Sequence, residues 1–290
     1  MAYSFQDFKV SENSKKPHFL LVGNPIEHSL SPVMHNTALR HHRIDAEYHA
    51  VNLLPNELTS FISWCNNSEF RGCNITIPYK ENLLSLVDSV DATAQEMGVI
   101  NTIVKEPGHL TGYNTDSHGF LKPLEPYLDM LEGGRAIIFG TGGSSKAVYH
   151  SLINAGVDEV VFVSRNPSFH NRANEDVLTQ TVGYSNWHAF AVESSIIINC
   201  TPVGMAPNTD DSILSKDESA LLKDKICYDL IYNPIRTKFL ELAEEAGGTP
   251  INGLDMLIYQ GDRSFQLWTG KEFPFMKVRN KLMEYFNSNQ

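Results

Sequence analysis

The residues whose types and spacing best suit chemistry lie at 72–80, which read G-C-N-I-T-I-P-Y-K. The alternation predicts a short strand with Asn74 and Thr76 on one face. The apolar residues of the other face are Cys73, Ile75 and Ile77. Pro78 cannot donate a backbone hydrogen bond, so the strand should end there, just before Lys80. That lysine can donate a proton, bind an anion or form a Schiff base, or it can be a surface residue after an edge strand.

Two serines, Ser29 and Ser31, stand between the first apolar run and a helical pattern. Hydroxyls two residues apart in an extended turn can both point at one carboxylate. Helix capping explains the same residues, because Ser31 before Pro32 is a favourable N-cap with proline at the first helical position. Taken alone, the pair favours capping.

An acidic residue, Asp116, ends the turn-like segment 112–116, G-Y-N-T-D, before another helical pattern. It can cap that helix. It can also pair with Lys80, orient the lysine and adjust its proton affinity for acid–base work. The sequence leaves both interpretations open.

A glycine-rich turn follows the apolar run Ala136–Phe139 and precedes a helical pattern. Its residues are Gly140, Thr141, Gly142, Gly143, Ser144 and Ser145. Glycines permit a tight turn and the close approach of a pyrophosphate, which the N–H groups of a helix start can bind. In this strand–turn–helix context the pattern favours a dinucleotide over a structural turn.

The end of the next strand indicates which dinucleotide is bound. Glu159–Val163 is followed by Ser164 and Arg165, where an NAD site usually carries an acidic residue for the ribose. Arg165 can bind a 2′-phosphate through paired N–H groups, which favours NADP. A solvent-facing arginine is the alternative.

Apolar runs alternate with helical patterns along the 290 residues, which predicts a two-domain α/β fold with mostly parallel sheets. We expect strands at Phe19–Val22, Tyr48–Leu53, Cys73–Ile77, Ile100–Val104, Ala136–Phe139, Glu159–Val163, Ser195–Cys200 and Ile226–Leu230. We expect helices at Val33–His41, Asn56–Cys65, Lys80–Val87, Gly119–Leu131, Ser145–Ala155, Lys238–Ala246, Gly253–Gly270 and Phe275–Phe286. A turn-rich segment is expected at Thr111–Thr115. The first 16 residues are expected to be loosely ordered or to form an added edge.

The formal net charge of −11 argues against nucleic acid or an anionic membrane as the main partner, because phosphates would be repelled. The first residues lack the apolar region of a secretory signal, and no apolar run approaches a membrane span, so we expect a cytoplasmic protein. The four cysteines show no C-x-x-C pairing and the 11 histidines no metal-ligand spacing. Reduced thiols and no metal site are therefore expected.

Eight motifs follow one another between Val22 and Trp268. They are Gly23–Asn36 (G-N-P-I-x-H-S-x-S-P-x-x-H-N), Asn74–Lys80 (N-I-T-I-P-Y-K), Gly98–Ile103, Gly112–Phe120, Gly140–Ala147, Asn199–Met205 (N-C-T-P-V-G-M), Tyr228–Pro234 (Y-D-L-I-Y-N-P) and Gly253–Gly261. With them the chain resembles the shikimate dehydrogenase family over nearly its whole length. The resemblance implies a discontinuous substrate-binding and catalytic domain, 1–117 with 253–290, a Rossmann NADP-binding domain, 118–252, and a cleft between them.

The resemblance also implies residue roles. Lys80 and Asp116 would form the catalytic acid–base pair. The substrate-binding residues would be Ser29 and Ser31 for a carboxylate with Tyr232 nearby, and Thr76, Asn101, Asp116 and Gln260 for ring hydroxyls. The cofactor-binding residues would be Gly140, Thr141, Gly142, Gly143, Ser144, Ser164, Arg165, Thr201, Gly253 and Met256.

The implied activity is the NADP-dependent, reversible reduction of 3-dehydroshikimate to shikimate in chorismate and aromatic amino acid biosynthesis, by a monomer or homodimer. A quinate/shikimate dehydrogenase using NAD or NADP is the close alternative, but Ser29 and the lack of an acid after Val163 favour shikimate and NADP. A non-catalytic ligand-binding relative should have lost Lys80 or Asp116. One departure concerns NADP: the family often has a second arginine close to the first, whereas here the next is Arg172.

Overall fold

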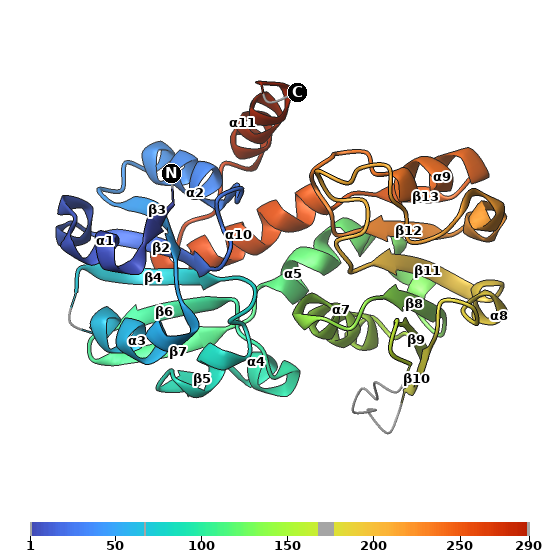
Figure 1. Cartoon of the computed structure of the whole chain (residues 1–290), viewed down its shortest axis with the longest axis horizontal. Helices are drawn as coiled ribbons and strands as arrows, with labels where there is room; N and C mark the ends of the chain where they lie inside the picture. Colours follow the sequence, from blue (N-terminus) through green and yellow to red (C-terminus); the bar gives the residue numbers. More distant parts are fainter. Residues whose placement is uncertain (1, 67, 168–176, 289–290) are drawn as a thin grey trace. The chain divides into compact units, whose positions relative to one another are not determined.

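The structure, a computed structural model, describes residues 2–66, 68–167 and 177–288. Arg172, the next arginine after Arg165, lies outside the described residues. The chain forms two compact units, unit 1 with Met1–Asp116 and Ile258–Gln290, and unit 2 with Ser117–Leu257 (Figure 1). None of the helices in the described part is both long and apolar enough to cross a lipid bilayer.

Unit 1 is built on a seven-stranded sheet with the order β1-β3-β2-β4-β6-β7-β5. The strands are β1 (Tyr3–Ser4), β2 (His18–Gly23), β3 (Glu47–Asn52), β4 (Phe70–Ile75), β5 (Ser89–Val90), β6 (Thr102–Glu106) and β7 (His109–Tyr113). β6 runs antiparallel to β4 and β7, and the other neighbours pair in parallel.

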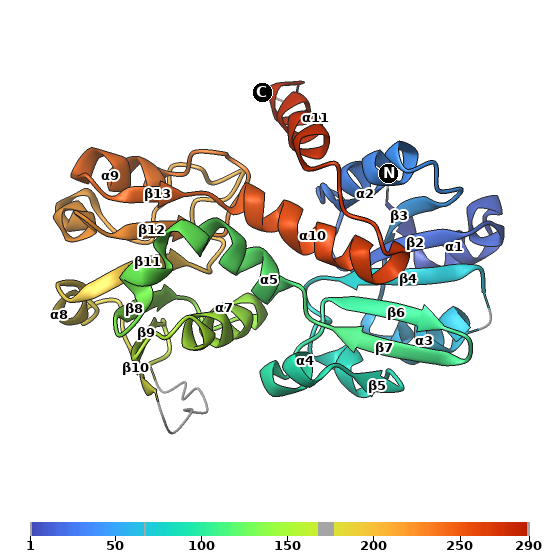
Figure 2. The same cartoon turned by 180° about the vertical axis from the view of Figure 1, so that it is seen from behind.

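Helices cover both faces of this sheet. α1 (Phe5–Val10) and α3 (Leu58–Asn66) pack on one face, and α2 (Ser31–His41) and α10 (Gly253–Thr269) on the other. Figure 2 shows α10 beside β4, where the Trp268 indole donates to the Ile103 carbonyl. α11 (Phe275–Ser288) packs on α2, and the short α4 (Ala92–Met97) contacts β7. The last two helices therefore complete the fold of the N-terminal sheet.

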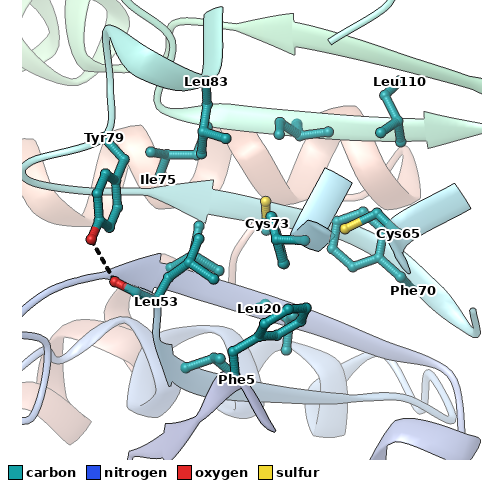
Figure 3. Packing of buried hydrophobic residues seen from close by; sticks show 14 of the residues in the cluster. Phe5, Leu20, Leu53, Cys65, Phe70, Cys73, Ile75, Tyr79, Leu83 and Leu110 are labelled. Atoms are coloured by element: carbon teal, nitrogen blue, oxygen red, sulfur yellow. Dashed lines mark hydrogen bonds between the residues drawn. The ribbon is translucent and has the colours of Figure 1, made fainter. Parts of the chain in front are cut away.

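An apolar core lies between the sheet and the α1–α3 layer, and the strands contribute Leu20 and Ile75 to it (Figure 3). Tyr79 closes this core, and its phenol donates to the Leu53 carbonyl. Cys65 and Cys73 lie in the same core as free thiols, and burial raises the pKa of both. Their burial makes these thiols unreactive packing groups, and the buried Tyr79 fixes the turn that precedes Lys80.

Two local predictions for unit 1 were wrong. β4 ends at Ile75 and Ile77 is 62% exposed, because the partner strand β2 itself ends at Gly23. The helix predicted at Lys80–Val87 is only a 3₁₀ turn, η3 (Asn82–Ser85), because the Lys80 carbonyl accepts from the Ile100 N–H instead of from within a helix.

The N-terminal residues form an added edge, since β1 pairs with β3 and Phe5 and Phe8 are buried. The segment Thr111–Thr115, expected as a turn, begins as the end of β7. The sequence did not predict its pairing with β6, because the strand contains Gly112 and its apolar and polar residues alternate only weakly.

Unit 2 is built on a six-stranded, all-parallel sheet with the order β10-β9-β8-β11-β12-β13. The strands are β8 (Arg135–Phe139), β9 (Glu159–Val163), β10 (Leu178–Val182), β11 (Ser194–Asn199), β12 (Ile226–Asp229) and β13 (Thr249–Ile251). The helices are α5 (Asp116–Leu121), α6 (Leu128–Leu131), α7 (Gly143–Asn154), α8 (His188–Ala191) and α9 (Lys238–Ala246), with 3₁₀ segments η4 (Lys122–Tyr127) and η5 (Lys216–Leu222). Apolar clusters on both faces of the sheet make this a doubly wound, Rossmann-type unit.

The helix predicted at Gly119–Leu131 is divided into α5, η4 and α6, because Pro123 and Pro126 lack the N–H that a continuous helix needs. The unit boundary in α10 falls after Leu257, five residues beyond the predicted one. The first turn of α10 packs in unit 2, where Met256 is part of the apolar cluster around Tyr228.

Candidate active site

An ion pair between Lys80 and Asp116 forms the centre of the candidate site in unit 1. Lys80 Nζ lies 2.6 Å from Asp116 Oδ2, and the side chains are only 13% and 9% exposed. Lys80 lies in the turn after β4, and Asp116 begins α5. The structure thus brings together the two residues whose contact the sequence left open.

The amide of Asn101 fixes the position of this carboxylate. Its Nδ2 donates to Asp116 Oδ1 at 2.8 Å and lies 3.4 Å from Gln260 Oε1. Its Oδ1 accepts from the Thr115 backbone N–H at 2.8 Å and from the Thr102 hydroxyl at 3.0 Å. Because both donors occupy Oδ1, the NH₂ group must face Asp116.

Further buried groups hold Asn101 in turn. The Tyr48 hydroxyl donates to Asn74 Oδ1 at 2.8 Å, and Asn74 Nδ2 donates to Ser264 Oγ at 2.8 Å and to Thr102 Oγ1 at 3.1 Å. Ser264 and Thr102 also lie 2.8 Å apart through their hydroxyls. We call this set the buried polar network: Tyr48, Asn74, Asn101, Thr102 and Ser264.

Sequence reasoning missed Tyr48, Thr102 and Ser264. One signal was available for Ser264, since it lies four residues after Gln260 and therefore on the same face of α10. Asn74 supports the end of β4, because its amide is buried and hydrogen-bonded within the network.

A buried histidine, His35, packs beside the network without joining it. Its ring stacks on Tyr48 with centroids 4.3 Å apart and lies against Trp268 and Phe273. Both ring nitrogens lack a hydrogen-bond partner among the described residues, and burial lowers the pKa of His35 to about 3. The ring is therefore neutral at physiological pH. Across the described residues, no three His, Cys, Asp or Glu side chains gather as a metal site would require.

The serine pair lies at the start of α2. Ser29 Oγ donates to Ser31 Oγ at 3.3 Å, and the Ser31 N–H lies 3.3 Å from Ser29 Oγ. The N-cap residue is Leu30, whose own side chain makes no capping hydrogen bond. Ser31 is therefore the first helical residue and not the predicted N-cap, whereas Ser29 Oγ accepts from the Ser31 N–H at the helix start. Thr76 lies just beyond β4, where a Cβ added to Gly23 would come within 2.4 Å of its methyl group.

The glycine-rich turn of unit 2 has the backbone that the sequence predicts. Gly140 has φ +103°, which favours glycine, and its N–H donates to the Val163 carbonyl at 3.0 Å. Gly142 is the N-cap of α7, and a Cβ there would have no described atom within 4 Å. Thr141, Gly143 and Ser144 are partly exposed beside it. The start of α7 is thus open to a bound anion.

A cavity of about 560 Å³ lies at the ends of the strands of unit 2. Its lining consists of Ser164, Arg165, Gly183, Tyr184, Ser185, Val203, Ser212 and Ile213. Arg165 and the serine hydroxyls suit a phosphate-bearing ligand, and no residue of this lining is acidic. The open glycine turn and this basic cavity fit a dinucleotide with an additional phosphate. The sequence did not indicate Tyr184, Ser185 or Ser212, because they lie in loops after β10 and β11.

Four other predicted residues also belong to unit 2. Thr201 follows β11, and both its N–H and its hydroxyl are bound by Asn199 Oδ1. Gly253 lies so close to the end of β12 that an added Cβ would be 2.1 Å from the Leu230 carbonyl oxygen. Met256 is buried in the core, and Tyr232 is largely buried, which raises its pKa. Their roles towards substrate and cofactor stay predictions.

A parallel sheet with a glycine turn and a basic cavity, in a chain that also holds a buried lysine–aspartate pair, defines a dinucleotide-dependent oxidoreductase. The family model of the shikimate dehydrogenase substrate binding domain matches residues 21–103, and that of the shikimate 5'-dehydrogenase C-terminal domain matches residues 253–283. The chain belongs to the shikimate dehydrogenase family.

Known relatives cover nearly the whole chain. The NADP(+) shikimate dehydrogenase of Methanopyrus kandleri is 37% identical, over 91% of this chain and 94% of its own. The Thermus thermophilus enzyme in complex with NADP(H) and shikimate is 32% identical, with a TM-score of 0.81 over 92% of this chain and 98% of its own. The Listeria monocytogenes enzyme in complex with shikimate and NAD is 30% identical, with a TM-score of 0.83 over 94% and 98%. The resemblance predicted from the eight motifs is confirmed.

Proposed function

We propose that this chain catalyses the reversible, NADP-dependent reduction of 3-dehydroshikimate to shikimate, a step of chorismate and aromatic amino acid biosynthesis. The observation that carries the proposal is the Lys80–Asp116 pair, at 2.6 Å and largely shielded from solvent. The names of the relatives and the shikimate complexes of the Thermus and Listeria enzymes support the same substrate.

The mechanism joins hydride transfer to proton transfer. NADPH, when bound, supplies a hydride to the carbonyl carbon of the substrate. The Lys80 ammonium donates a proton to the carbonyl oxygen as negative charge develops there. Asp116 orients that ammonium and is itself oriented by Asn101. In the reverse direction, neutral Lys80 would accept the hydroxyl proton of shikimate, and NADP⁺, when bound, would accept the hydride from the same carbon.

The substrate-binding assignments follow the family motifs. Ser29 and Ser31 would bind the carboxylate, since their hydroxyls lie 3.3 Å apart at the start of α2. The groups assigned to the ring hydroxyls are Thr76, Asn101, Asp116 and Gln260, with Tyr232 assigned near the carboxylate. The contact of Asn101 with both Asp116 and Gln260 supports the grouping of these three. Apart from Tyr232, which belongs to unit 2, we assign this substrate and catalytic role to unit 1.

The cofactor assignments concern unit 2. The turn residues Gly140–Ser144 would bind the pyrophosphate at the start of α7, and Ser164 and Arg165 the 2′-phosphate in the basic cavity. Thr201, Gly253 and Met256 are assigned to the nicotinamide side. Arg165, without an acidic residue in that lining, favours NADP over NAD.

The test is a spectrophotometric assay of shikimate with NADP at alkaline pH, followed as NADPH absorbance. Lys80→Met should lower kcat by about 10²- to 10⁴-fold, the usual contribution of a positioned general acid or base, with a smaller change in shikimate affinity. The matched control is Lys15→Met, which removes an exposed lysine. A near-normal kcat in Lys80→Met would contradict the catalytic role.

Quinate dehydrogenation with NAD or NADP is the second candidate, and the Listeria complex with shikimate and NAD bears only on its cofactor. Relative kcat/KM values for shikimate and quinate with each cofactor decide between the two. No cofactor reduction with any of the four pairs would instead indicate a non-catalytic binding protein.

The cellular setting is part of the same proposal. We place the enzyme in the cytoplasm, where thiols stay reduced, which agrees with its four free cysteines. We expect a monomer or homodimer, and sedimentation equilibrium distinguishes the two.

A further inference from the structure

Asp229, the last residue of β12, is a fully buried carboxylate that the mechanism above does not use. Its Oδ1 accepts from the Ile231 N–H at 3.0 Å and from Asn199 Nδ2 at 3.1 Å. Its Oδ2 accepts from the Thr237 hydroxyl at 2.6 Å. All three donors are neutral, so the charge is held by hydrogen bonds without a counter-ion among them.

One of these bonds helps to determine the orientation of the Asn199 amide. A carboxylate only accepts, so Asn199 must direct its NH₂ group to Asp229 and its Oδ1 the other way. That Oδ1 accepts from the N–H of Thr201 at 2.9 Å and from its hydroxyl at 2.7 Å. The Thr201 Oγ1 in turn accepts from the Val203 N–H at 3.2 Å. Asp229 and the Val203 carbonyl, which accepts from the same Asn199 Nδ2 at 3.1 Å, therefore set the conformation of the loop after β11 together.

The other two bonds hold the loop after β12. Ile231 and Thr237 lie near its two ends, and Tyr232 lies between them. Thr237 is also the N-cap of α9, so the loop is tied to the start of that helix. The Ile231 carbonyl accepts from the Gly253 N–H at 3.1 Å, which extends the connection to the start of α10.

The charge of Asp229 opposes folding. Burial is the main effect and raises the pKa of Asp229 to about 6. The titratable group that faces it is the Cys200 thiol, whose pKa is raised mainly by burial and further by Asp229. A group that disfavours folding while holding two loops of assigned residues points to a functional reason for its presence.

We propose that Asp229 is a positioning residue for the reaction: it orients Thr201 through Asn199 and holds the loop of Tyr232 and the Ile231–Gly253 contact in one geometry. The proposal rests on the proposed function for what Thr201 and Tyr232 bind. The connection between the two loops is a property of unit 2 alone.

The first experiment measures the loops without turnover. In Asp229→Asn, the Thr201 and Ile231 amides should exchange with deuterium faster than in the wild type, and NADPH should bind about three- to tenfold more weakly, because neutral hydrogen bonds are weaker than charge-assisted ones. The matched control is Ile226→Val, which removes a buried methyl group at the other end of β12. Asn199→Ala removes the side chain that joins Asp229 to Thr201 and should weaken NADPH binding at least as much.

The second experiment compares pH profiles. The ratio of the NADPH Kd of Asp229→Asn to that of the wild type cancels the titration of the cofactor's own phosphate. This ratio should be about three- to tenfold at pH 8 and approach one near pH 5, where Asp229 is protonated in the wild type too. The KM for NADP should follow the same ratio more closely than kcat does.

The proposal is overturned if the Kd ratio stays near one at pH 8, if it does not change with pH, or if Ile226→Val weakens NADPH binding equally. A wild type that binds NADPH but does not oxidise shikimate would refute the proposed function instead. The exchange and binding measurements would still decide the role of Asp229.

Discussion

The Asp229→Asn variant should be more stable than the wild type at neutral and alkaline pH. The pKa of this carboxyl rises from 3.8 to about 6 on folding. Because the pKa of Asp229 is higher in the folded state, the protonated carboxyl contributes fully to stability below pH 3.8, and this contribution is lost as the pH rises through 6. This rise in the pKa corresponds to about 3 kcal/mol against folding at pH 8. The variant is neutral at every pH and avoids this cost.

The assay is equilibrium urea denaturation of both proteins between pH 5 and pH 8, followed by circular dichroism and tryptophan fluorescence. The variant should be more stable by about 1.5 kcal/mol at pH 5 and about 3 kcal/mol at pH 8, since the folded and unfolded forms of Asp229 differ in protonation over this range. Other titrating groups cancel in the difference. A variant less stable than the wild type at pH 8, or a difference that does not change with pH, would refute the reasoning. Greater stability with weaker NADPH binding would mark Asp229 as retained for function.

Three further predictions concern other parts of the molecule. Arg165→Leu should raise the Kd for NADP about 10- to 100-fold by titration calorimetry and leave that for NAD within about twofold, because only NADP has the phosphate that the guanidinium would bind. Ser264→Ala should lower the free energy of unfolding by about 1–3 kcal/mol, because it removes an acceptor of the buried Asn74 amide. The control is Thr269→Ala, which removes a hydroxyl from the same helix and should lower the free energy of unfolding by less than about 1 kcal/mol in the same urea assay. The free energy of unfolding of His35→Phe, measured relative to the wild type, should rise by about 2 kcal/mol as the pH falls from 7.5 to 5. The reason is that the pKa of His35 is about 3 in the folded wild type and 6.5 in the unfolded chain, so the wild type loses stability as the pH falls through 6.5. An unchanged difference would mean that His35 is not neutral in the folded state.

The strands of the two sheet centres were predictable because they are buried on both faces and read as continuous apolar runs, as at Ala136–Phe139 and Glu159–Val163. The strands missed, such as β1 and β10, are short or polar edge strands whose residues resemble loops. The false helix at Lys80–Val87 has helical spacing, but a tertiary hydrogen bond from Ile100 takes the carbonyl that the helix would need.

The site was predictable where residue type and sequence context coincide, as in the glycine turn. It was not predictable where function depends on long-range hydrogen bonds. Asn74 and Ser264 are 190 positions apart, and their contact follows only from the packing of α10 on β4. Asp229 stood in a quoted motif, but nothing in the sequence indicated that its carboxylate would be buried against Asn199 and Thr237.

The division of unit 1 along the chain sets an order for folding during synthesis. Unit 2 is one continuous segment, Ser117–Leu257, so all of its strands can pair before the ribosome has made the rest. Unit 1 must wait for α10, since Trp268 packs over Gly72 and Phe19 and Ser264 completes the hydrogen bonds of Asn74. Until then, the first part of the chain to emerge carries an apolar sheet face that α2 covers only in part, and the last part to emerge covers the rest. The nascent N-terminal half is therefore the segment most exposed to aggregation and to chaperone binding.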